Sequence, residues 1–78
     1  MTATIASLIR QSSLLIAEFN PQLAKVWDSR PFSRVETAYA FARGFKGDDI
    51  HPAASAVIRA ALMERDLRKE KYAAMEKL

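Results

Sequence analysis

The sequence predicts an all-α fold, a compact four-helix domain with a short second helix and a long C-terminal helix. Apolar residues recur at helical spacing along most of the chain, and no stretch alternates apolar and polar residues as a half-buried strand does. Proline and glycine fall between these periodic segments, where they end one helix and start the next. The chain has 78 residues, half of them apolar, so residues 1–78 are expected to form a single domain.

The first helix is expected over about residues 4–19. Leu14 points away from its apolar stripe, which is wide enough to face a core. The members of the stripe are Ile5, Leu8, Ile9, Ser12, Leu15, Ile16 and Phe19.

The second helix is expected to be short, from Pro21 to about residue 27 or 28. Asn20 is a favoured N-cap residue, and a proline at the first helical position lacks only an N–H that the helix does not use. Three of its apolar residues are expected to face the core: Leu23, Val26 and Trp27.

The third helix is expected over residues 34–43. Ser33 and Glu36 have the spacing of a capping box, and Gly44 suits the left-handed residue that ends many helices. Apolar residues cover all but one narrow strip, so this is predicted to be the central and most buried helix. Aromatic residues at this spacing indicate a core more often than a ligand slot: Trp27, Tyr39, Phe41 and Phe45.

The fourth helix is expected to begin near residues 50–52, capped by Asp49 or His51, and to run to the C-terminus. Its roughly 26 residues would span about 39 Å, more than any partner helix in the chain. One apolar face is the natural core face: Ile50, Ala54, Val57, Ile58, Ala61, Leu62, Tyr72 and Met75. A second, heptad-like row suits another helix lying close against it: Ala56, Ala60, Met63, Leu67, Ala74 and Leu78.

The composition argues against catalysis. The sequence has no cysteine and a single histidine, which excludes thiolate chemistry and most metal clusters. Asp48, Asp49 and His51 form the one group of acids with an imidazole, and residues of this kind just before a helix usually cap it. No enzymatic activity, cofactor or metal site is therefore expected.

The net charge of +3 falls entirely within residues 20–47. Four of its cations are candidates for a patch that meets nucleic acid or an acidic protein: Arg30, Arg34, Arg43 and Lys46. Leu23 to Arg43 also resembles a helix-turn-helix, although Pro31 occupies the turn and the spacing is one residue longer than usual. The alternative hypothesis is therefore a small nucleic-acid-binding regulator that uses residues 20–47.

The favoured function is that of a non-enzymatic protein–protein interaction module that regulates, adapts or inhibits a larger partner as a homodimer. A domain this small gains stability by burying a second helix face against another chain. The expected partner or dimer interface comprises Leu14, Ala60, Met63, Leu67 and Ala74. The apolar segments are too short to span a membrane and lack the pattern of a signal peptide, so a cytoplasmic location is expected.

Overall fold

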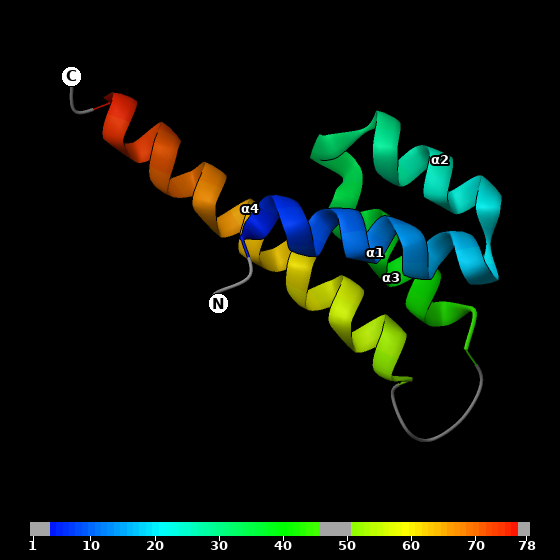
Figure 1. Ribbon diagram of the computed structural model, residues 1–78. Helices are drawn as coiled ribbons and strands as arrows, with labels where there is room; N and C mark the ends of the chain where they lie inside the picture. Colours follow the sequence, from blue (N-terminus) through cyan, green and yellow to red (C-terminus); the bar gives the residue numbers. More distant parts are fainter. Residues whose placement is uncertain (1–3, 46–50, 77–78) are drawn as a thin grey trace.

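The computed structural model describes residues 4–45 and 51–76, and over these residues the chain forms four α-helices and one short 3₁₀-helix (Figure 1). The predicted all-α class, the short second helix and the long last helix are confirmed, and the described helix ends agree with the predicted ones to within two residues. The 3₁₀-helix occupies the predicted turn before the third helix. In chain order the elements are α1 (Ile5–Phe19), α2 (Pro21–Ser29), η1 (Pro31–Ser33), α3 (Arg34–Arg43) and α4 (Pro52–Glu76).

The starts of the helices follow the local sequence. The Asn20 side chain accepts a hydrogen bond from the Leu23 N–H at 3.2 Å, which confirms the predicted cap of α2. The His51 Nδ1 atom accepts from the Ala53 N–H at 3.1 Å, so this imidazole caps α4. Asp49, the other predicted cap, lies outside the described residues.

Two predictions about α3 are wrong. Ser33 makes no side-chain cap hydrogen bond, because η1 already holds its backbone in a turn (φ −101°, ψ 10°) rather than in the extended conformation that a capping box needs. Gly44 is right-handed (φ −71°, ψ −16°) rather than left-handed. The helix ends instead in a tightened turn, in which the Gly44 N–H donates to the Phe41 carbonyl at 3.0 Å.

The core lies where α1 and α3 pack against the first half of α4, with α2 packed across α1. Trp27, Ile16 and Val57 are fully buried. The Trp27 indole N–H donates to the Ile9 carbonyl at 3.1 Å, which ties α2 to α1 and pairs the buried nitrogen of this ring. Val26, predicted to face inward, is on the exposed side of α2.

The buried face of α4 lies between the two apolar rows that the sequence predicts. Val57 is at the centre of this face, and alanines on both sides of Val57 are also buried. Both α1 and α3 pack against this part of α4, and the small alanine side chains let both helices approach closely. Ala60, predicted for an interface with another chain, is therefore 3% exposed within its own fold. The central helix is thus the first half of α4 rather than α3, whose Tyr39 is exposed.

The second half of α4 runs past the other helices. In Figure 1 it projects, in orange and red, beyond the first turn of α1, and the longest dimension of the molecule is 46 Å against 27 and 24 Å. Buried residues end at Ala61. Tyr72 and Met75 were predicted on the core face, but they are 59% and 64% exposed because the bundle ends before it reaches them.

Candidate interaction surface

Two separate surfaces lie on the free half of α4, which we define as residues 63–76. The first, the outer row, consists of Met63, Leu67 and Ala74, all of them exposed. The second faces η1 and includes Tyr72. Successive residues of a helix are 100° apart, so Leu67 and Tyr72 point in directions that differ by about 140°. The two surfaces therefore face largely different directions, although Ala74 also lines the second one.

The outer row keeps only part of the interface predicted from the sequence. Leu67 lines a groove beside Ile5 and Ile9, at the first turns of α1. Leu14 is exposed, but it is on the side of α1 opposite the buried residues and more than a turn further along that helix, so the structure does not bring it to the row. Ala60 is covered by the chain itself.

The second surface, which we call the Phe32 groove, runs along α4 beside η1 and the start of α3. Phe32 is 83% exposed, and the Arg68 guanidinium lies over its ring at 4.6 Å from the centroid. The groove has a volume of about 390 Å³ next to α3, where Val35 and Ala61 form its floor. It continues along the free half of α4 as a larger hollow of about 750 Å³ lined by Phe32, Arg68, Lys71, Tyr72, Ala74 and Met75.

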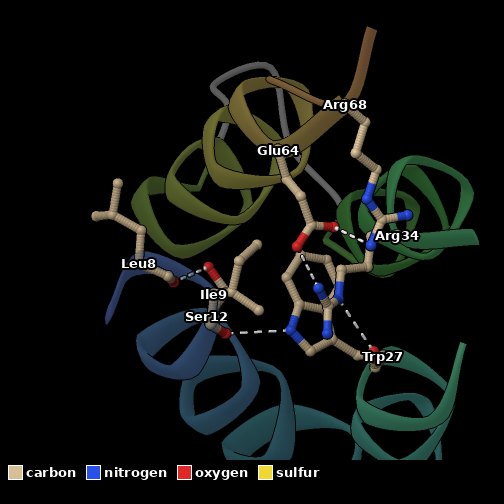
Figure 2. Close-up of polar contacts among 7 residues, drawn as sticks. All are labelled: Leu8, Ile9, Ser12, Trp27, Arg34, Glu64 and Arg68. Atoms are coloured by element: carbon tan, nitrogen blue, oxygen red, sulfur yellow. Dashed lines mark hydrogen bonds and ion pairs between the residues drawn. The ribbon is translucent and has the colours of Figure 1, made fainter. Parts of the chain in front are cut away.

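A polar cluster holds the inner end of this groove in place (Figure 2). The Arg34 guanidinium donates through Nε to the Trp27 carbonyl at 3.2 Å and through a terminal nitrogen to the Glu64 carboxylate. Arg68 approaches the other carboxylate oxygen of Glu64 at 3.6 Å. The Arg34 and Glu64 side chains are only 14% and 15% exposed, so the ion pair that joins α3 to α4 is largely shielded from water.

The four cations predicted to form a patch are not brought together. Arg34 is occupied by Glu64, whereas Arg43 is exposed at the opposite end of α3, about 14 Å further along its axis. Arg30 is the C-cap residue of α2, and Lys46 lies outside the described residues.

The cations that do gather are on α4, and the sequence reasoning missed them because the charges of its second half cancel. Arg65, Arg68 and Lys69 line the groove beside α3, and Lys71 lines its continuation. The sequence feature that could have revealed these cations is their helical spacing. The cations at 65, 68 and 69 share a side of the helix with Tyr72, and the acids at 66 and 70 lie on the other side.

At the other end of the bundle, His51 is a structural residue. Its ring stacks on Phe45 with the centroids 4.4 Å apart, and Phe19 packs edge-on against both rings. Within residues 4–45 and 51–76, no group of three His, Cys, Asp or Glu side chains is placed to hold a metal ion. Over the same ranges, every buried side-chain nitrogen or oxygen has a hydrogen-bond partner.

The fold and these surfaces define a small all-α domain with a protruding helix. None of its described helices is both long and apolar enough to cross a bilayer. Comparisons with protein families, curated proteins and solved structures find no match to this chain.

Proposed function

We propose that the protein is a non-enzymatic protein-interaction module that binds through the free half of α4. The observation that carries this proposal is that α4 continues for several turns after its last buried residue, Ala61, and keeps large apolar side chains on those turns. A short helical segment without tertiary contacts is marginal in water. Packing against another protein would supply the missing contacts, and such a module would regulate, adapt or block the larger partner that it binds.

We further propose that the outer row pairs with a second copy of the chain. The described residues 64–76 carry four acids and four bases, so two free halves do not repel one another.

This self-association is expected to be weak. Burying the exposed parts of Met63 and Leu67 in both copies removes roughly 300 Å² of surface, or about 7 kcal/mol of gross stabilisation. Association itself costs about 4–15 kcal/mol in lost freedom of motion. Even at the lower end of that cost the net gain is about 3 kcal/mol, so a dissociation constant of about 5 mM or weaker is expected.

Sedimentation equilibrium between about 100 μM and 5 mM tests this expectation, because the upper end of that range approaches the expected dissociation constant. The wild-type mass should rise from the 8.7 kDa of one chain toward twice that value. The double variant Met63→Glu, Leu67→Glu should stay monomeric and helical by circular dichroism. Leu14→Glu is the control, since it places a glutamate on an exposed leucine away from the row. A wild-type mass of 8.7 kDa throughout would show that the chain does not pair with itself.

The alternative, a nucleic-acid-binding regulator that uses residues 20–47, has less support. Arg34 is held by Glu64, and the middle of α3 is turned into the core through Thr37, Ala38 and Phe41. A recognition helix instead presents a polar face to the groove of a duplex. Titration of labelled duplex DNA at low salt tests this alternative, and salt-sensitive micromolar binding would favour it.

A further inference from the structure

We infer that the Phe32 groove is a docking site for an acidic amphipathic helix of a partner protein. The inference rests on the proposed function and names the chemistry of the partner. It uses a different face of α4 from Met63 and Leu67, so pairing of two copies through these two residues leaves Phe32 accessible, and Ala74 is the residue that both surfaces share.

The shape of the groove fits a helix. Its wall on α4 is built from residues spaced by three or four positions, from Ala61 through Arg68 to Tyr72 and Met75. Fourteen residues of helix rise about 21 Å, which is enough to contact roughly four turns of a second helix. A helix lying in such a groove inserts apolar side chains at positions i, i+3, i+4 and i+7.

Phe32 gives the groove its apolar anchor. Most of its ring is exposed, on a 3₁₀ turn that the Pro31 ring stiffens, with one cation resting over it. Placing a phenylalanine in water contributes nothing to folding, whereas aromatic residues surrounded by charged rims are the usual anchors of interfaces. Tyr72 and Met75 extend the apolar surface along α4.

The charge around the groove selects an acidic partner. Arg34 and Glu64 neutralise each other at the inner end. The other charged residues that line the two parts of the groove are one acid, Glu36, and four bases: Arg65, Arg68, Lys69 and Lys71. Arg65 also pairs with Asp66 at 3.4 Å, and with this acid counted the bases around the groove still outnumber the acids. Acidic side chains that flank the apolar face of a bound helix would lie next to these bases, and a basic helix would be repelled.

The test is a fluorescence-anisotropy titration with a labelled amphipathic peptide of about 16 residues, carrying leucines at helical spacing and glutamates beside them. A second peptide has lysine in place of every glutamate, and a third probe is single-stranded DNA of about 12 nucleotides. We expect the acidic peptide to bind at least about tenfold more tightly than the basic one, with a difference that shrinks as salt is added.

Matched variants locate the binding. Phe32→Ser should lower the affinity for the acidic peptide by at least about fivefold. Leu14→Ser, which changes another exposed apolar residue, should leave that affinity unchanged. Arg65→Glu with Lys69→Glu should abolish the preference for the acidic peptide. Lys25→Glu with Arg43→Glu makes the same change of charge on exposed residues that do not line the groove and should preserve that preference.

Three results would overturn the inference. The first is equal affinity for the two peptides, and the second is no loss of affinity for the acidic peptide with Phe32→Ser. The third is that the DNA binds more tightly than the acidic peptide and that the groove variants abolish this DNA binding. In each case the sedimentation experiment separates the outcomes. A concentration-dependent rise in mass that Met63→Glu, Leu67→Glu removes would keep the proposed module and reject only the acidic helix. A monomer that binds neither peptide would reject both.

Discussion

Removing the charge of Arg34 is expected to destabilise the fold substantially, because this residue fastens α3 to α4. The Arg34→Met variant keeps the side-chain stem but loses the ion pair with Glu64 and the hydrogen bond to the Trp27 carbonyl. It also leaves the Glu64 carboxylate, which is only 15% exposed, with Arg68 as its remaining cation at 3.6 Å.

The expected loss lies between the values for exposed and for buried ion pairs. Exposed pairs contribute up to about 1 kcal/mol, whereas breaking a fully buried pair costs about 3–5 kcal/mol. Arg34 and Glu64 are largely shielded but still reach water, so we expect the free energy of unfolding to fall by about 2 kcal/mol. A chain of this length has a total free energy of unfolding of roughly 4–12 kcal/mol, so a loss of about 2 kcal/mol is a large fraction of it.

Urea denaturation followed by Trp27 fluorescence measures this loss, since Trp27 is the sole tryptophan and is fully buried. With a slope of about 1 kcal/mol/M, the midpoint should drop by about 2 M. In a double-mutant cycle, Glu64→Met alone should also lower the free energy of unfolding. The double variant Arg34→Met, Glu64→Met should lose less than the sum of the two single losses, by about 1–2 kcal/mol.

A control for general charge effects is Asp66→Asn, which removes an exposed ion pair with Arg65 and should change the free energy of unfolding by less than about 0.5 kcal/mol. Additive losses in the cycle, or an Arg34→Met variant as stable as the wild type, would refute the reasoning, because the two side chains would then not be coupled.

Three further predictions concern the helices. Asn20→Ala should lower the free energy of unfolding by about 1 kcal/mol in urea denaturation through loss of the α2 cap, whereas Ser33→Ala should lower it by less than about 0.5 kcal/mol because that hydroxyl caps nothing. A larger loss for Ser33→Ala would contradict the observed start of α3. Val57→Ala should cost about 2–3 kcal/mol in the same assay, since it opens a cavity in the fully buried centre of α4, and a loss below 1 kcal/mol would mean that the site collapses. Tyr72→Ser with Met75→Ser should leave the urea midpoint within about 0.5 M of the wild type, because both residues are mostly exposed, and a larger drop would place them in the core.

Local sequence signals predicted the helix limits well where cap residues and prolines mark them. Asn20 and Pro21 fix the start of α2 because cap and proline act on their own neighbours, and the same holds for the exposed position of Leu14 on an amphipathic helix. The capping box of Ser33 failed although its spacing is correct, since the turn of η1 just before it decides the backbone conformation. A pattern of two residues does not record the geometry of the segment that precedes it.

The candidate site was predicted only in part. Met63 and Leu67 were placed correctly on an exposed row, but the groove beside Phe32 was not predicted at all. Its walls come from η1, α3 and α4, and Arg34 and Glu64, which hold its inner end, are 30 positions apart in the sequence. Summing charges along the chain made residues 48–78 look neutral, because such a sum ignores which side of the helix each charge occupies.

The sequence by itself determined the all-α class, the helix limits to within two residues, the cap at Asn20 and the length of the last helix, and it left Asp49 and His51 as alternative caps of α4. These features depend on backbone preferences and on side chains that act within one or two turns. Only the tertiary structure decided that Ala60 lies in the core while Tyr72 and Met75 lie outside it. The apolar pattern of α4 is compatible with burial on either row, and the choice depends on where α1 and α3 pack and on where they end.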